Sequence, residues 1–447
     1  MSTLTTDQFT DTRLYFRQHF EQYALHLPGN TDQQLHQLRK RAMGRLDSLS
    51  LPTRRDEEWK YTSVTRLLQP HYADGQSEVS NDPHGSEDFA FPDEIRVPII
   101  NGIPHIPENL PEGLSIFRID EAYRTEKFRD TINHWMKIWT TEETDPFIVL
   151  NAALARGGVC IHVSKKAVIN QPVHMACINV SGASPIAVHP QLFVIAEPHS
   201  ELTLIESYQA EKDESLPAAF YNVVNRLHLD QNARIRHIKL QDGHDEAFHI
   251  NNTRAEQARD SVYSHYAAEI GSRLVRNNLH AIHQGEGVHT DLYGACLVSG
   301  KQHVDNHTFI DHAMPHCTSN ELYKNIISDR GTGVFNGKVI VRQDAQKTNA
   351  FQQNSNLLLS DRAVMDSKPQ LEIFADDVKC SHGATIGQLD ETAVFYLRSR
   401  GLPEHSARRL LQVAFLGEVV DHFPSEAVQE AVEKLIGRKM KGENNTH

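Results

Sequence analysis

The sequence predicts a mainly β fold whose central part is flanked by helical regions at both ends of the chain. Between residues 159 and 373, short segments place apolar residues at every second position, as in Val159–Val163 and Val339–Val341. This period of two is typical of β-strands. Glycine, asparagine, aspartate and proline separate the segments, and few stretches between them could form amphipathic crossover helices. A doubly wound parallel sheet needs such helices, so the sequence disfavours it.

Before the β region, the chain has the pattern of helices. Apolar residues recur over 7–27 and, at near-helical spacing, over 35–46, which predicts two helices, the second ending before Pro52. In the charged segment that follows, Trp59 and Tyr61 are expected to anchor the chain to the next domain.

An acidic stretch then separates these helices from the next ones. Residues 72–94 are rich in glycine, serine, aspartate and proline, which predicts a linker. Asp120 is a candidate cap for a helix that continues to Trp139. A further helix is expected to begin near Asp145 and to end at Gly157, because glycine commonly terminates helices.

Two architectures are compatible with the β region, a sandwich and a solenoid of stacked β-coils. Several strands carry polar residues on one face, as in Arg234–His237. A β-helix would bury the inward residues of such strands and leave their outer face in water. No strict sequence repeat is visible, so periodicity alone leaves both architectures open.

The chain becomes helical again after residue 400. Pro403 suits the first turn of a helix. Apolar residues over 407–420 cover more than one stripe, which is typical of a helix buried between two surfaces. Ser425 is a candidate cap for a second helix, with apolar residues over 428–436 on one face.

Composition and charge exclude several classes of function. The 447 residues suffice for two or three domains, and the net charge of −13 argues against a general binder of nucleic acid or anionic membranes. The N-terminal residues lack the apolar core of a signal peptide, and no apolar run of about 18 residues occurs, so no membrane span is expected. The five cysteines are scattered and form no CxxC pair, which fits a reducing cytoplasm.

Cys380 and His382 are the first candidate site residues. They are two positions apart in Lys379–Gly387, so a strand would place both side chains on one face. A nearby imidazolium could lower the pKa of the thiol. Two residues are too few ligands for an iron–sulfur cluster, which commonly takes four cysteines, and this shortfall indicates a site shared with a second chain.

The segment Asp311–Cys317 is a second candidate, because it contains two histidines and a cysteine. Imidazole and thiolate together suit zinc or iron. No spacing matches a closed site of four ligands, and the alternative is that these histidines form structural hydrogen bonds. The neighbouring histidines are His280, His283, His289, His303 and His307.

Six short motifs occur in a specific order along the chain. They are Glu57–Thr62, Asp311–Cys317, Gly333–Val339, Gln353–Ser360, Lys379–Thr385 and Phe395–Gly401. On these motifs the chain resembles the SufB/SufD family of iron–sulfur cluster assembly scaffolds, and more closely its SufD-like members. The resemblance covers nearly the whole chain and is weakest before residue 50.

The resemblance implies a fold with a right-handed parallel β-helix core. It implies an N-terminal helical region with the acidic linker at 1–145, the β-helix at 146–395 and a C-terminal helical domain at 396–447. Period and composition agree with the two helical ends and the β core, and the resemblance selects the β-helix over the sandwich.

The resemblance also implies a function and partners. SufD-like chains are non-catalytic subunits of a SufBCD-type complex: they pair with a SufB-like subunit through the β-helix and dock a SufC-like ABC ATPase through the C-terminal helices. The expected dock includes Leu410, Leu411, Ala414 and Phe415. The isolated chain is expected to be a monomer or a homodimer. No cofactor is expected to be permanently bound, and iron or an iron–sulfur cluster would be held transiently with the partner.

This sequence departs from the SufB-like pattern at three positions. Gly383 stands where SufB-like chains have a glutamate after the histidine, and Ala363 and Leu397 lie where they have cysteines. By analogy the chain contributes His382, with Cys380 as the weaker candidate, to a shared site that helps iron reach the interface. Two alternatives remain: a carbohydrate-active β-helix enzyme with carboxylates grouped on one outer face, and a purely structural interaction protein.

Overall fold

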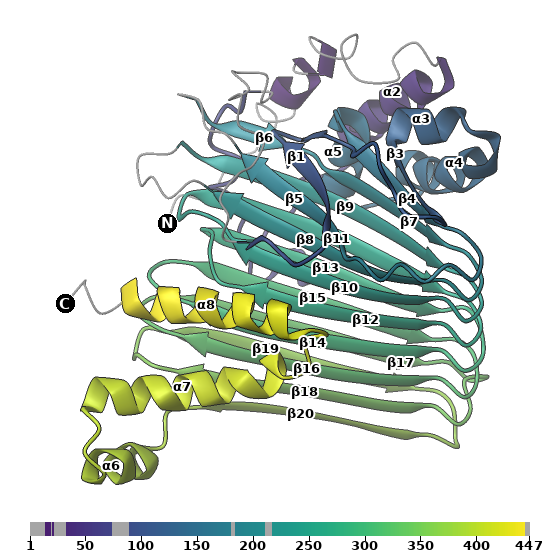
Figure 1. Cartoon of the computed structure of the whole chain (residues 1–447). Helices are drawn as coiled ribbons and strands as arrows, with labels where there is room; N and C mark the ends of the chain where they lie inside the picture. The colour runs from purple at the N-terminus through teal and green to yellow at the C-terminus, as the bar shows by residue number, and fades with distance from the viewer. Residues whose placement is uncertain are drawn as a thin grey trace.

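The computed structural model describes residues 14–18, 20–21, 33–73, 89–179, 184–210 and 217–442, and its centre is a stack of parallel β-strands (Figure 1). The strands form two ten-stranded sheets, and successive strands from β7 onwards alternate between them. The chain therefore winds as a solenoid with one strand of each sheet per coil. The predicted mainly β fold with a parallel β-helix core and helical ends is confirmed, and the sandwich alternative is wrong.

The first sheet, here called sheet 1, has the strand order β2-β1-β5-β8-β10-β12-β14-β16-β18-β20. Its strands are β1 (Ile95–Ile100), β2 (Ile103–Pro104), β5 (Val173–Asn179), β8 (Glu201–Ala210), β10 (Arg234–Asp242), β12 (Val262–Glu269), β14 (His289–Val298), β16 (Thr318–Ile327), β18 (Asn349–Leu358) and β20 (Lys379–Gly387).

The second sheet, sheet 2, has the order β19-β17-β15-β13-β11-β9-β7-β4-β3, with β6 paired to β9. Its strands are β3 (Leu114–Arg118), β4 (Gly158–Val163), β6 (Ile186–Val188), β7 (Gln191–Ala196), β9 (Ala219–Leu229), β11 (Ala247–Gln257), β13 (Leu274–His283), β15 (His303–His312), β17 (Thr332–Val341) and β19 (Val364–Ile373).

The coils repeat through backbone geometry at one corner. Wherever the chain leaves sheet 2 for sheet 1, from β7 to β18, one residue has a positive φ between 56° and 70°. Its N–H donates to a carbonyl of the next coil, as from His199 to Gln231 and from Asp260 to Glu286. The residues at these corners are His199, Asn232, Asp260, Gly287, His316 and Lys347. Only the backbone conformation repeats, which explains why no sequence repeat is visible.

The interior between the sheets is apolar near the N-terminus and partly polar further along. In β10, Ile235 and His237 both face inward and are fully buried, while Ile238 and Leu240 face outward. His237 bonds Glu206, and the buried Lys239 pairs with Glu269 at 2.8 Å. Inward-facing polar groups are therefore paired with one another inside the solenoid, as buried polar groups require.

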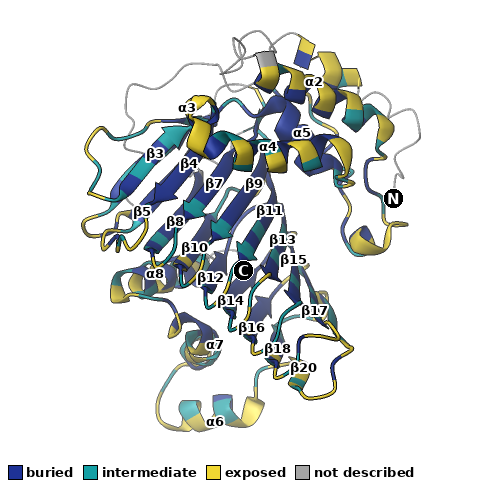
Figure 2. Cartoon of the chain, turned by 90° about the vertical axis from the view of Figure 1, so that its right-hand side faces the viewer, coloured by how far each residue is buried: buried dark blue, intermediate teal, exposed yellow. Residues whose placement is uncertain are grey.

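Helices cover part of the outer face of each sheet, whereas other outward residues, such as Arg234 and Arg236 of β10, are exposed as expected (Figure 2). The N-terminal helices pack on sheet 2 and the C-terminal helices on sheet 1, as the apolar clusters with Phe193 and Phe220, and with Ile238 and Tyr266, show. The helices are α2 (Gln33–Ser48), α3 (Ile119–Arg124), α4 (Glu126–Thr141), α5 (Pro146–Leu154), α6 (Glu391–Ser399), α7 (Glu404–Val420) and α8 (Glu426–Gly442).

Most of the predicted helix boundaries match the structure. Helix α2 occupies the predicted 35–46, and Asp145 caps α5 by accepting from Phe147 N at 2.8 Å. Asp120 lies inside α3 instead of capping one long helix, and Pro403 precedes the first turn of α7. Ser425 accepts from Val428 N at the start of α8.

Some predictions concern the N-terminal part of the chain, which the structure describes only in part. Residues 14–18 and 20–21 of the helix predicted at 7–27 are helical, and its remainder and most of the linker at 72–94 lie outside the described residues. Trp59 anchors its segment as predicted, because it is buried under the guanidinium of Arg276 at 4.6 Å. In the described part of the chain, no helix combines the length and the apolar character that a bilayer crossing requires.

Candidate functional site

Strand β20 ends the stack and is the most exposed strand of either sheet (Figure 1). It pairs with β18 on one side, and no strand of the described chain pairs with its other edge. Strand β19 likewise pairs with β17 alone among the described strands. The last coil thus presents two rows of backbone N–H and C=O groups that can accept further strands.

Cys380 and His382 lie on the inward face of β20, as their spacing predicts. Their register partners in β18 are Ala350 and Gln352, both buried inside the solenoid. Cys380 is half-buried against the core, and His382 is exposed because no coil follows. Burial raises the pKa of Cys380, so the hypothesis that an imidazolium lowers it is wrong for the chain alone.

From His382, a column of polar side chains continues along the solenoid axis into the preceding coils. Gln352 lies opposite His382 in the register, and its Nε2 donates to Glu321 Oε2 at 2.7 Å. Gln352 Oε1 and Glu321 Oε1 are buried without hydrogen-bond partners. Burial raises the pKa of Glu321 to about 7. The sequence places Glu321 and Gln352 each within a strand-like segment. It does not reveal the register between coils that stacks them under His382.

Replacing Glu321 with glutamine is expected to remove a pH dependence of stability. The folded-state pKa of about 7 exceeds the unfolded value, so the free energy of unfolding is highest below pH ~4.3 and falls as the pH rises to about 7. Glu321→Gln keeps the acceptor for Gln352 and should be more stable than wild type at pH 8, by roughly 1–3 kcal/mol. Denaturant midpoints at pH 5 and pH 8 measure this. The control is Glu372→Gln, whose side chain is 42% exposed, and the same pH dependence in wild type and Glu321→Gln would contradict the expectation.

Large exposed apolar side chains lie around the open end of the solenoid, and together they are called the terminal patch. The terminal patch consists of large side chains that are 42% to 62% exposed. They lie on or next to the last three strands, β18 to β20. Exposed apolar groups gathered beside unpaired strand edges are typical of an interaction surface. The residues of the terminal patch are Phe351, Val364, Ile373, Phe374 and Ile386.

The C-terminal helices carry a second exposed apolar surface. Helix α7 buries Leu416, Val419 and Val420 against sheet 1, but Leu410 is 48% exposed. Leu411 and Phe415 are half-buried and Ala414 is exposed. Helix α7 thus packs on sheet 1 and beside α6 and α8, and within the described chain its face with Leu410 and Ala414 stays uncovered.

The segment Asp311–Cys317 does not complete a ligand set at Cys380. In register, Ser319 of β16, Ala350 of β18 and Cys380 of β20 follow one another, so the segment lies about two coils from the open end. His312 and Cys317 instead lie next to His283. Among the residues that the structure describes, these three are the one group with metal-ligand geometry, and it includes neither Cys380 nor His382.

Comparison with known proteins covers nearly the whole chain. Residues 178–415 match the family described as "SUF system FeS cluster assembly, SufBD core domain" and residues 10–175 match "SufBD protein N-terminal region". The chain belongs to the SufB/SufD family. The match includes the terminal coil and most of α7, so the SufB/SufD core extends over both exposed surfaces.

Similarity to individual proteins of the SufB/SufD family supports this assignment. The chain is 34% identical over 422 residues to an iron–sulfur cluster assembly SufBD family protein of Synechocystis sp., covering 91% of this chain and 92% of the relative. It is 29% identical to the iron–sulfur cluster assembly protein SufD of Escherichia coli, covering 88% and 90%. It is 27% identical to SufD of Bacillus subtilis, covering 69% and 70%. A role in iron–sulfur cluster assembly follows, and two of these relatives are named SufD.

Proposed function

We propose that the chain is a non-catalytic scaffold subunit of a SufBCD-type complex, in which a SufB-like subunit docks on the terminal coil. The observation that carries this proposal is that two strand edges without partner strands lie beside the apolar terminal patch. A partner of the same fold can continue both sheets through main-chain hydrogen bonds and cover the patch with its own last coil. Without a partner, these edges are a template for aggregation.

A SufC-like ATPase docks on the exposed part of α6 and α7 in this proposal. Leu410, Leu411, Ala414 and Phe415 form its centre, and Phe395 at 71% and Tyr396 at 57% exposure extend it. Such large aromatic groups are enriched at the centre of protein interfaces. ATP-driven closure of two ATPase subunits would pull on the C-terminal helices of both scaffold subunits and reshape the interface at β20, which immediately precedes α6 in the chain.

His382 and Cys380 would help iron reach this interface. Imidazole and thiolate are suitable ligands for iron, and the chain supplies two of them at the edge where the partner docks. The partner would provide the remaining ligands, so iron or a cluster is cargo held transiently. All five cysteines are free thiols, which suits a reducing cytoplasm.

His382→Ala in the reconstituted complex is expected to lower its iron content by at least about 10-fold, because a metal ligand is lost at a site with few ligands. Iron per complex and cluster absorbance under anaerobic reconstitution measure the effect. The control His105→Ala removes an exposed histidine far from the terminal coil. Normal iron content and cluster formation in an assembled His382→Ala complex would overturn the role of His382.

A further inference from the structure

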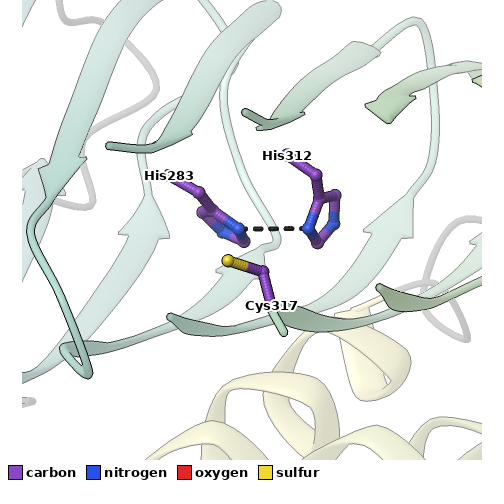
Figure 3. A group of neighbouring side chains, drawn as sticks. All are labelled: His283, His312 and Cys317. Atoms are coloured by element: carbon purple, nitrogen blue, oxygen red, sulfur yellow. Dashed lines mark hydrogen bonds between the residues drawn. The ribbon is translucent and has the colours of Figure 1, made fainter. Parts of the chain in front are cut away.

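Two histidines and a cysteine meet inside the solenoid, at a corner between the sheets (Figure 3). His283 ends β13, His312 ends β15 in register with it, and Cys317 immediately precedes β16. All three are fully buried, and their ligand atoms lie within 4.8 Å of one another. Two successive coils, through the ends of β13 and β15 and the start of β16, thus place two imidazoles and one thiol around a common point.

Hydrogen bonds determine the tautomer of His283. Gln257 Nε2 donates to His289 O at 3.1 Å, which places Gln257 Oε1 toward Thr290. Thr290 donates its single hydroxyl proton to this oxygen at 2.7 Å. Thr290 Oγ1 must therefore accept from His283 Nε2, 2.9 Å away. It follows that His283 Nδ1 carries a lone pair and no proton.

That lone pair faces His312. The two Nδ1 atoms are 3.1 Å apart, so in the metal-free chain His312 Nδ1–H donates to His283 Nδ1. His312 Nε2 lies 2.9 Å from Ser319 Oγ, a hydroxyl that can either donate or accept. His312 can therefore move its proton from Nδ1 to Nε2 when Ser319 rotates its hydroxyl. Both Nδ1 lone pairs would then face the same point.

The distances suit a shared cation. A tetrahedral metal with bonds of about 2.0–2.1 Å to nitrogen holds two nitrogens about 3.3 Å apart, close to the separation of the two Nδ1 atoms. The Nε2 atoms face Thr290 and Ser319, in the way that the second nitrogen of a metal-bound histidine is normally held by a hydrogen bond.

The protonation states are also compatible with metal binding. Burial lowers the pKa of His283 well below its usual value and that of His312 to about 4, so both imidazoles are neutral. Burial raises the pKa of Cys317 to about 11, and hydrogen bonds from the backbone at Val288 and Gly287 oppose this rise. The thiol, a weak donor, lies within hydrogen-bond distance of Gly285 O at 3.4 Å and Pro315 O at 3.6 Å.

We propose that His283, His312 and Cys317 bind one divalent transition-metal cation of the Zn²⁺/Fe²⁺ class, through both Nδ1 atoms and the thiolate. Two nitrogens and a sulfur favour such borderline-soft ions over Mg²⁺ or Ca²⁺. Binding releases the Cys317 proton to solvent, while the His312 proton moves to Nε2, so one proton leaves per cation. The bound ion would fasten two successive coils at one corner. This site is separate from Cys380 and His382 and does not depend on the proposed function.

Cobalt provides the test, because a thiolate bound to Co²⁺ produces a charge-transfer absorption. The full chain, produced in cobalt-supplemented minimal medium, is expected to contain about one Co²⁺ and to show this absorption with tetrahedral d–d bands. Cys317→Ser should lose the absorption, and His312→Gln should lose most of the metal. Cys296→Ser, which removes another buried cysteine, and His382→Ala should keep both.

Three results would overturn the proposal. They are wild-type chain without bound Co²⁺ or Zn²⁺, absorption that persists in Cys317→Ser, and absorption that Cys380→Ser abolishes. If the Cys317 and His312 variants fail to fold, X-ray absorption of the wild-type cobalt chain decides. A shell with one sulfur and two imidazole nitrogens supports the site, and a shell without sulfur overturns it. In the supporting case, Zn²⁺ should also raise the Tm of the wild type and of Cys296→Ser.

Discussion

Ile386→Glu is expected to weaken pairing with a SufB-like subunit by at least about 30-fold, because a charge at the centre of a desolvated interface costs about 2 kcal/mol or more. Ile386 is 51% exposed on β20, where the outer edge of the strand has no partner within the described chain. Other residues of the terminal patch, such as Ile373 and Phe374, are also exposed. The substitution should leave the fold intact, because Ile386 is not part of the buried core.

Val168→Glu is the matched control for this substitution. Val168 is 53% exposed, but it lies between β4 and β5, at the opposite end of the stack from β20. Titration of each variant with the SufB-like subunit, together with circular dichroism of the free chains, measures the effect. If Ile386→Glu binds as tightly as Val168→Glu, the terminal coil is not the docking surface.

The isolated chain offers a second measurement on the same surface. Two copies of this chain could cover each other's terminal patch through the same strand edges, which would produce the homodimer considered from the sequence. Light scattering after size exclusion distinguishes a monomer from a homodimer. A homodimer that Ile386→Glu converts to a monomer places self-association on this patch, in competition with the partner.

The β class was predictable from the sequence because strand periodicity is local, whereas the choice of solenoid was not. The repeat lies in the left-handed corners, where residues as different as His199, Asn232 and Lys347 adopt the same backbone conformation. A period of two also does not say which face is buried, so it did not show that the polar His237 faces the interior. Helix-covered outer faces depend on long-range packing that no local pattern encodes.

The candidate site was predictable in part. The spacing of Cys380 and His382 places them on one face of β20, as the structure shows. The column from His382 to Gln352 and Glu321 requires the register between coils, which is set by corner lengths along the whole solenoid. For the same reason, the sequence shows only that His283 precedes Asp311–Cys317 in the chain. The register between β13 and β15 is what places it against His312.

Asp305→Asn is expected to destabilise the chain by about 3–5 kcal/mol, because it leaves the buried cation of Arg276 without a counter-charge. The two side chains are 1% and 2% exposed and are paired at 2.6 Å. The same carboxylate accepts from the hydroxyl of Thr62, and Arg276 donates to Glu58 O at 2.8 Å and lies over Trp59. Loss of the Asp305 carboxylate should therefore also detach the N-terminal segment from sheet 2.

The pH dependence identifies the charge as the cause. Arg276 holds the pKa of Asp305 well below its ordinary value, against the opposing effect of burial. The stabilisation is therefore complete above the unfolded-state pKa of about 3.9 and is lost as the pH falls further below it. The difference between wild type and Asp305→Asn should be largest near pH 7 and shrink toward pH 3, as measured by guanidinium unfolding. Trp59 contributes to the fluorescence signal.

Two further variants separate an uncompensated charge from general damage. The double variant Arg276→Met/Asp305→Asn should recover part of the stability, because it removes the cation together with its partner. Asp377→Asn removes a carboxylate that is 65% exposed and paired with Lys347, and it should change stability little. A loss below about 1 kcal/mol in Asp305→Asn, or a double variant as unstable as the sum of both single variants, would show that the pair does not act as a buried ion pair. If the double variant recovers stability, Trp59 and its apolar neighbours suffice to hold the N-terminal segment on sheet 2.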